Sequence, residues 1–232
     1  MEKKPSQNLL KLLAAVFMAL DHIGLCCQPE CIPLQVIGRL AMPLYCFSLA
    51  AGFQRTRSKP RYFGRILLLA ILSEYPFDLF LFGYFSWEKQ NVLVTFFFAL
   101  LLLEALEGSR RRQGIGKAPY FLAAAVFLLA PEFLLADYGS FGVLLVLLFY
   151  MTRNLPHRLV FQALGLLLLS CFSGSYEIAL GPLNIPIEIF SVFSVIPLAL
   201  CQGKGRRTGA VQQWAFYLFY PVHILILSFF RF

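Results

Sequence analysis

Apolar runs approaching twenty residues recur along the whole of this chain, and they limit its fold more than any other feature. A helix needs about 20 apolar residues to cross the ~30 Å hydrocarbon core of a bilayer. The 232 residues are 59% hydrophobic and 14% charged, whereas soluble domains are about half apolar and a quarter charged. Because no polar stretch is long enough for a second domain, residues 1–232 are predicted to form one all-α polytopic membrane domain.

The apolar runs predict nine transmembrane helices. Their limits are 9–27, 33–53, 62–82, 91–107, 119–135, 138–152, 157–172, 184–201 and 212–230. The runs 119–135 and 138–152 are short, so they are expected to form either a tight helical hairpin or a partly re-entrant pair, and the number is nine give or take one. The first run is interpreted as a helix and not as a signal peptide, because Asp21 and His22 interrupt it.

Basic residues are concentrated in the N-terminal tail and in every second loop. They are Lys3, Lys4, Lys11, Arg55, Arg57, Lys59, Arg61, Arg65, Arg110, Arg111, Arg112, Lys117, Arg153, Arg158, Lys204, Arg206 and Arg207. Short loops rich in Lys and Arg stay in the cytoplasm, so the N-terminus is predicted inside and the C-terminus outside a bacterial cytoplasmic membrane. The net charge of +8 is expected to serve orientation and contact with anionic lipid. A nucleic-acid partner is not expected, since no loop is long enough to form a folded nucleic-acid-binding domain.

Several predicted helices carry ionisable residues within the membrane, where each costs about 2.5–3.5 kcal/mol on insertion scales. They are Asp21 and His22 in the first helix, Arg39 in the second, Glu74 and Asp78 in the third, Glu188 in the eighth and His223 in the ninth. A rise of ~1.5 Å per residue places all of them in the outer half of the bilayer. We therefore expect one shared polar cavity that opens outward.

Two interpretations of this layer remain open. In the first, Arg39 lies between Glu74 and Asp78, which share a helix face, and bridges them to Asp21. In the second, the charges are a structural network in which Arg39 pairs with Asp21 or Asp78. Histidines beside carboxylates are better suited to proton transfer than to ion pairing. The sequence therefore favours a chemical role for the two histidines, and Tyr220 could orient His223.

Sequence blocks along the chain resemble the TraX family of membrane proteins. They are Asp21-His22-Ile23-Gly24, Gly38-Arg39-Leu40-Ala41-Met42-Pro43, Gly52-Phe53, Tyr75-Pro76-Phe77-Asp78, Asn91-Val92-Leu93-Val94-Thr95, Asp137-Tyr138-Gly139 with Gly142, and Phe216-Tyr217-Leu218-Phe219-Tyr220-Pro221-Val222-His223. The resemblance implies N-acetylation of a pilin subunit, which is the founding activity of the family. The family is also similar to membrane acyltransferases that move an acyl group from cytosolic acyl-CoA to an extracytoplasmic protein, glycan or lipid.

Acyl transfer assigns roles to the residues of the polar layer. His22 or His223 would deprotonate the acceptor, and Arg39 or a protonated histidine would stabilise the oxyanion. Asp21 or Asp78 would orient a histidine or Arg39. Direct transfer and a histidine acyl intermediate both stay open. The supporting or substrate-binding candidates are Glu74, Asn91, Asp137, Tyr138, Glu188 and Tyr220.

The donor is expected to be acetyl-CoA or another acyl-CoA, as a co-substrate and not as a bound cofactor. Its phosphates would be held by Arg55, Arg57, Lys59, Arg61 and Arg65, because guanidinium groups bind phosphate in a bidentate manner. No metal is expected, since Cys26, Cys27 and Cys31 have no matching zinc-ligand pattern. The alternative functions are a transporter with an outward-facing charged cavity and a non-catalytic scaffold. The acceptor, the acyl chain and the oligomeric state stay open.

Overall fold

The computed structural model describes residues 7–27, 30–180, 183–201 and 209–231. The basic residues Lys3, Lys4, Lys204, Arg206 and Arg207 lie outside this part of the chain. The helices are α1 Gln7–Cys27, α2 Ile32–Gly38, α3 Ala41–Arg55, α4 Lys59–Phe82, α5 Val92–Arg110, η1 Gly114–Lys117, α6 Ala118–Phe133, α7 Gly139–Thr152, α8 Arg158–Ser170, η2 Ile187–Ser194, α9 Val195–Leu200 and α10 Ala210–Arg231. The strands are β1 Glu177–Leu180 and β2 Leu183–Pro186.

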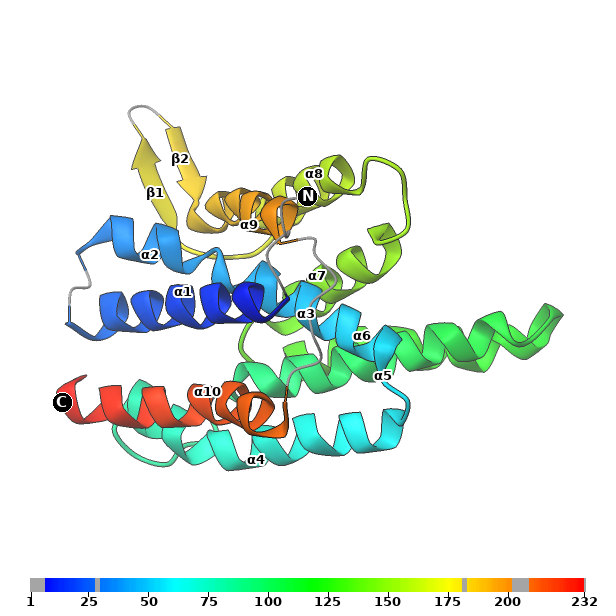
Figure 1. Ribbon diagram of the computed structural model, residues 1–232, viewed down its shortest axis with the longest axis horizontal. Coiled ribbons are helices and arrows are strands. Elements are labelled where there is room, and N and C mark those ends of the chain that lie inside the picture. Colours follow the sequence, from blue (N-terminus) through cyan, green and yellow to red (C-terminus); the bar gives the residue numbers. More distant parts are fainter. Residues whose placement is uncertain (1–6, 28–29, 181–182, 202–208, 232) are drawn as a thin grey trace.

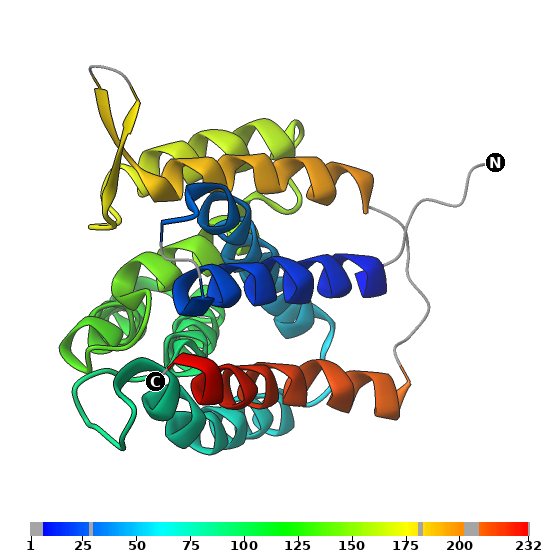
Figure 2. The ribbon, with the colours of Figure 1, turned by 90° about the vertical axis from the view of Figure 1, so that its left-hand side faces the viewer.

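The long helices run side by side along one axis of the molecule (Figure 1). Figures 1 and 2 both place α10, the last helix, beside α1 and α4, and α10 contacts both of them. The start of α1 and the start of α10 lie at the same end of the bundle. The α5–α6 hairpin projects beyond the other helices at that end. The first and last helices of the sequence are therefore packed together on one side of the bundle.

Five helical segments are long and apolar enough to cross a bilayer. They are Asn8–Cys26, Ile32–Arg55, Val92–Arg110, Gly114–Phe133 and Gln212–Arg231. Their surfaces carry many exposed large apolar side chains, among them Leu12, Leu122 and Phe229, which water would not tolerate and lipid would. The described chain is therefore a helical membrane protein. Helix α4 is as long as the others, but Glu74 and Asp78 interrupt its apolar sequence.

Most of the predicted spans coincide with single helices, but among these, within the described residues, only α1, α5, α6 (with η1) and α10 are long and apolar enough to cross a bilayer. The predicted span 33–53 is not continuous. It is divided into α2 and α3 at Arg39 and Leu40. Pro43 lies four residues after Arg39, so it cannot donate a hydrogen bond to the Arg39 carbonyl, and its ring crowds that carbonyl. The break falls at the one arginine that lies within the predicted span.

The prediction of a helix over 184–201 is wrong for its first three residues. Residues Leu183–Pro186 form β2, which pairs antiparallel with β1, and a 3-10 helix follows over Ile187–Ser194. Ile185 precedes a proline, which disfavours the α-helical region for it, and Pro186 stands directly before the first residue of the 3-10 helix. The described chain is thus all-α except for this small hairpin.

The short pair 119–135 and 138–152 forms a tight helical hairpin, α6 and α7. The connection contains two non-glycine residues with positive φ, Leu135 at 53° and Tyr138 at 63°. It is held against the start of α5, because Gln90 N donates to the Leu135 carbonyl over 3.1 Å and Thr95 Oγ1 donates to the Asp137 carbonyl over 2.6 Å. The hairpin alternative of the sequence analysis is the one observed.

Helices α3, α5 and α7 pack around a core of fully buried side chains. The largest include Leu44, Leu100, Leu103, Leu145 and Phe149. Gly142 allows the close approach of α5 and α7, since a Cβ at this position would lie 2.7 Å from Thr95 Cγ2. Small residues at helix crossings are the usual means of close packing in membranes, where apolar burial gives little driving force. This core fixes α3 and the α6–α7 connection, which carry part of the site.

Candidate functional site

Arg39 joins two buried carboxylates that come from distant parts of the sequence. Its Nη2 donates to Asp21 Oδ1 of α1 over 2.5 Å, and its Nη1 donates to Glu188 Oε1 of the 3-10 helix over 2.8 Å. Asp21 is 8% exposed and Glu188 is 3% exposed. The planar guanidinium presents several donors in a fixed fork, which suits it to hold two acceptors at once. The predicted pairing of Arg39 with Asp21 is confirmed, and Glu188 completes it.

Gly38 allows Asp21 to approach Arg39. A Cβ on Gly38 would lie 2.6 Å from Asp21 Cγ, with Asp21 Cβ and Oδ1 closer still. Helix α2 therefore packs directly on the Asp21 side chain, and only glycine fits at the contact. The sequence by itself does not reveal this role of Gly38, because it does not show that α1 and α2 are in contact.

Asp78 and Glu74 do not contact Arg39, and the prediction that Arg39 bridges them is wrong. Asp78 is fully buried and accepts a 3.2 Å hydrogen bond from the backbone N of Ser86. Glu74 accepts from both the side-chain amide and the backbone N of Asn91. Asn91 also donates to the Ala70 carbonyl over 2.8 Å. These contacts fasten the connection after α4, and the start of α5, onto α4.

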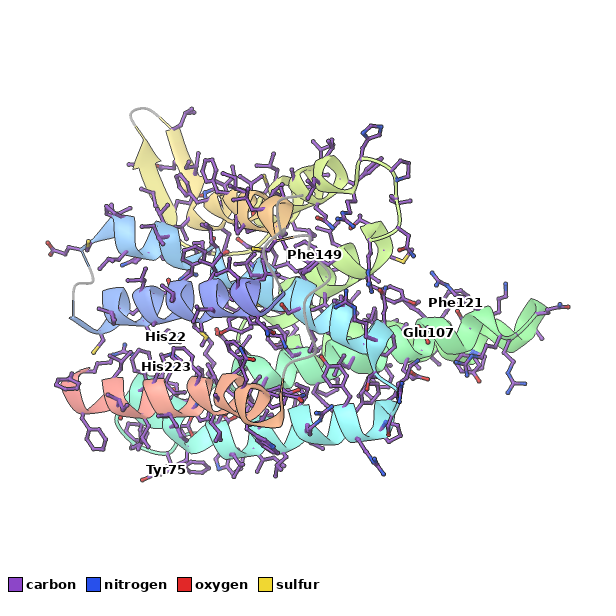
Figure 3. All side chains as sticks on the ribbon, viewed as in Figure 1. His22, Tyr75, Glu107, Phe121, Phe149 and His223 are labelled. Carbon is purple, nitrogen blue, oxygen red and sulfur yellow. The ribbon has the colours of Figure 1, made fainter. Side chains whose placement is uncertain are left out.

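His22 and His223 form a pair between the first and the last helix, as Figure 3 shows. The His22 Nδ1 and His223 Nε2 atoms are 2.7 Å apart, and His223 Nδ1 lies 2.7 Å from the Phe219 carbonyl oxygen. A carbonyl only accepts, so His223 Nδ1 carries a proton. In a neutral His223 the Nε2 is then an acceptor, and His22 Nδ1 is the donor. This fixes the His22 tautomer that leaves Nε2 unprotonated.

The Phe219 carbonyl, not Tyr220, orients His223. Tyr220 contacts the imidazole only through its ring, at 5.9 Å between centroids and an angle of 58°. The carbonyl belongs to the residue four positions before His223, one turn earlier on α10, where helical side chains lean. The expectation that Tyr220 orients His223 is therefore wrong, and the backbone of α10 orients the imidazole instead.

One cavity of about 2090 Å³ connects the charged layer to the opposite end of the bundle. At one end it is lined by Asp21, His22, Arg39, Asp137, Tyr138 and Glu188. At the other end it is lined by Lys11, Arg55, Arg57, Arg61 and Arg65. His22 lines the cavity, whereas His223 is 9% exposed and is absent from the lining. The two chemically different ends of the cavity are thus continuous with each other.

Lys59 does not join the basic end of the cavity. Its Nζ pairs with Glu104 Oε2 over 2.6 Å and with Glu107 Oε2, both on α5. Lys11 lines the cavity in its place. Lys11 lies seven residues before Met18 and eleven before His22 on α1, and both of these also line the cavity. This spacing places the three side chains on one face of α1, so the sequence itself indicated that Lys11 lies on the same face as His22.

The cavity is bordered at the charged end by loops outside the predicted spans. Lys89 Nζ pairs with Asp137 Oδ1 over 2.8 Å. Residues 172–176, which follow α8, also line this end, and the Tyr176 hydroxyl donates to Gln35 Oε1 of α2. Burial raises the pKa of the Tyr176 phenol above its ordinary value, although the charge of Arg39 opposes the change. The phenol therefore stays protonated and remains a donor.

Apolar helices around a cavity with buried carboxylates, an arginine and a histidine pair define the chain as a multi-pass membrane protein with an internal polar site. The family model described as TraX protein matches residues 6–231. The chain belongs to the TraX family, as the resemblance in its sequence blocks implied.

Two relatives match the chain in sequence. The chain is 31% identical over 241 residues to the "Probable fimbrial assembly protein FimC, serogroup H1" of Dichelobacter nodosus, covering 94% of this chain and 92% of that protein. It is 28% identical over 152 residues to the "Uncharacterized protein RP591" of Rickettsia prowazekii (strain Madrid E), covering 64% of this chain and 56% of that protein. No solved structure matches the chain.

Proposed function

We propose that this protein is a membrane-embedded acyltransferase that moves an acetyl or other short acyl group from cytosolic acyl-CoA to an extracytoplasmic acceptor. The observation that carries the proposal is the single cavity that joins a basic end to the layer of His22 and Arg39. The proposed orientation has nine apolar segments, the N-terminus in the cytoplasm of a bacterial cell and the C-terminus outside. The basic end then faces the donor, and the charged layer faces the acceptor.

The length of the cavity fits a donor with a long flexible arm. Arg39 and Arg55 both line it, Arg39 two residues before the start of the 15-residue helix α3 and Arg55 at its end. This helix is about 22 Å long at 1.5 Å per residue. In this proposal Lys11, Arg55, Arg57, Arg61 and Arg65 bind the CoA phosphates. The pantetheine arm extends through the cavity and brings the thioester to His22.

The proposed step begins when His22 Nε2 takes the proton from the acceptor amine or hydroxyl. The acceptor attacks the thioester carbonyl, the C–O or C–N bond forms, and Arg39 stabilises the negative charge on the carbonyl oxygen. The carbon–sulfur bond then breaks, the thiolate of CoA leaves, and the imidazolium of His22 returns the proton to it. His223 contacts His22 and not the cavity, so it serves as a positioning residue for His22.

The family and the D. nodosus relative support a pilin-like acceptor. That relative is named as a probable fimbrial assembly protein, and the resemblance to TraX implies a pilin amine. We propose an exported amine or an envelope hydroxyl as the acceptor, reached through the end of the cavity near Asp137. Asp78, Glu74 and Asn91 lie outside the cavity lining, and we assign them a positioning role in the fold of α4 and α5.

The test uses purified protein in lipid nanodiscs with radiolabelled acetyl-CoA and an envelope fraction as acceptor. We expect CoA binding and transfer or slow hydrolysis by the wild type. His22→Gln is expected to lower the rate about 10²- to 10⁴-fold, the range of general acid–base catalysis. His157→Gln is the matched control, because His157 is exposed at the start of α8. Absence of CoA binding, hydrolysis and transfer in the wild type would contradict the proposal, and solute counterflow in proteoliposomes would then support the transporter.

A further inference from the structure

Tyr138 lies beside Arg39 at the cavity and has a hydroxyl proton that no described residue accepts. The Tyr138 oxygen accepts from Arg39 Nη1 over 3.4 Å, and both side chains line the cavity. Arginine has no acceptor atom, so this contact leaves the phenolic proton unused. Arg39 Nε is also buried and has no partner within the described residues. The Tyr138 hydroxyl and Arg39 Nε are therefore two donors, side by side at the cavity, that have no acceptor among the described residues.

The backbone at Tyr138 adopts a strained conformation to reach this position. Its φ is 63° and Gly139 follows at 41°, with Leu135 at 53° earlier in the same connection. A non-glycine residue in the left-handed region costs of order 1–3 kcal/mol and persists only where the surroundings enforce it. Strain of this kind collects at functional sites, so the conformation of Tyr138 indicates a function for its side chain.

The surroundings of the connection enforce this conformation through several contacts. Thr95 Oγ1 donates to the Asp137 carbonyl over 2.6 Å, and Asp137 N donates to the Gln90 carbonyl over 2.8 Å. The Tyr138 ring is stacked on Phe141 with centroids 6.2 Å apart and an angle of 20°. The backbone and the ring are both held, so the phenolic oxygen has a fixed place beside Arg39.

We propose that Tyr138 is a catalytic residue whose hydroxyl, together with Arg39, donates a hydrogen bond to the carbonyl oxygen of the donor thioester as it becomes an oxyanion. This inference rests on the acyl transfer proposed above and adds a residue to its chemistry. The hydroxyl donates without losing its proton, so the bonds that form and break are unchanged. The positive charge of Arg39 near the phenolic oxygen makes the O–H a stronger donor. A fixed donor contributes most where charge develops in the transition state.

The decisive variant is Tyr138→Phe, which keeps the ring, its stacking on Phe141 and the backbone conformation. We expect kcat for acyl transfer or acetyl-CoA hydrolysis to fall about 10²- to 10³-fold, the usual effect of removing one oxyanion donor. The KM for acetyl-CoA and the Tm are expected to stay near their wild-type values. Tyr75→Phe is the matched control, because Tyr75 is 58% exposed on α4 and does not line the cavity.

A second variant, Leu135→Gly, separates the strain of the connection from the hydroxyl. It relieves one positive φ without removing the phenol, and we expect the kcat loss to be much smaller than that of Tyr138→Phe. An active wild type with an equally active Tyr138→Phe would overturn this inference alone. So would a Tyr138→Phe that changes only KM or only Tm. An inactive wild type would instead overturn the acyltransferase proposal, and this inference with it.

Discussion

At the scale of single residues, the burial of Arg39 depends on the two carboxylates that it contacts. Removing one partner from a buried ion pair leaves a charge without compensation, which is far more costly than the pair itself. Asp21 and Glu188 come from different elements, so Arg39 also joins the first helix to the segment after the β hairpin. The same argument does not apply to exposed pairs, where water and salt weaken the interaction.

Arg39→Ala is therefore expected to destabilise the protein by about 3–5 kcal/mol. Lys89→Ala removes a cation from the neighbouring pair with Asp137, whose side chains are 43% and 28% exposed, and is expected to cost about 0–1 kcal/mol. Thermal unfolding of both variants in detergent would measure the difference. Equal changes in Tm would show that the Arg39 cluster is not a buried network.

At the scale of elements, close contacts through glycine decide where side chains of the site can lie. Helix α2 is only seven residues long, and it can pack on Asp21 only because Gly38 has no side chain. A Cβ added at Gly64 on α4 would meet no atom within 4 Å, so no packing reason requires glycine there. The two positions therefore make a matched comparison.

Gly38→Ala is expected to push Asp21 away from Arg39, to cost about 1–3 kcal/mol as an overpacked contact, and to lower the transfer rate. Gly64→Ala is expected to be neutral or to stabilise α4 by about 0.5–1 kcal/mol, because alanine restricts the unfolded chain and favours helix. Tm and transfer rate, measured for both variants, would test this. A Gly38→Ala protein with wild-type stability and rate would contradict the assigned contact.

At the scale of the whole molecule, the two ends of the cavity carry different charges. The basic end contains cations from α1, α3 and α4, and the other end contains the carboxylates that surround Arg39. Electrostatic attraction between exposed groups falls with added salt. Donor binding at the basic end should therefore be salt-dependent, whereas the chemistry at the buried end should not.

The double variant Arg61→Ala and Arg65→Ala is expected to raise the KM for acyl-CoA about 10-fold or more and to leave kcat nearly unchanged, since uniform binding is lost. Arg112→Ala is the charge-matched control, because Arg112 is exposed in the connection after α5 and does not line the cavity. Steady-state kinetics at two salt concentrations would measure both. An unchanged KM in the double variant would place the donor elsewhere.

The proposed orientation of the molecule can be tested by labelling. In a chain whose six cysteines are replaced, Trp87→Cys and Ile115→Cys introduce thiols at positions that are 75% and 92% exposed. A membrane-impermeant maleimide is expected to label position 87 in intact cells and position 115 only after the membrane is opened. The reverse pattern would invert the topology and exchange the two ends of the cavity.

The membrane class, most of the helical segments and the set of costly residues were all predictable from the sequence, because each depends on local composition and on the free-energy cost of charge in lipid. Asp21, His22, Arg39, Glu188 and His223 were identified in this way. Their partners became known only from the packing of the helices, since His22 and His223 are 201 residues apart in the chain. Packing also separated Asp78 and Glu74 from Arg39 and paired Lys59 with α5. Hydrophobicity decides which segments enter the bilayer. It does not decide which helices become neighbours, because lipid is as apolar as the side chains that face it, so that choice depends on close packing and polar pairing.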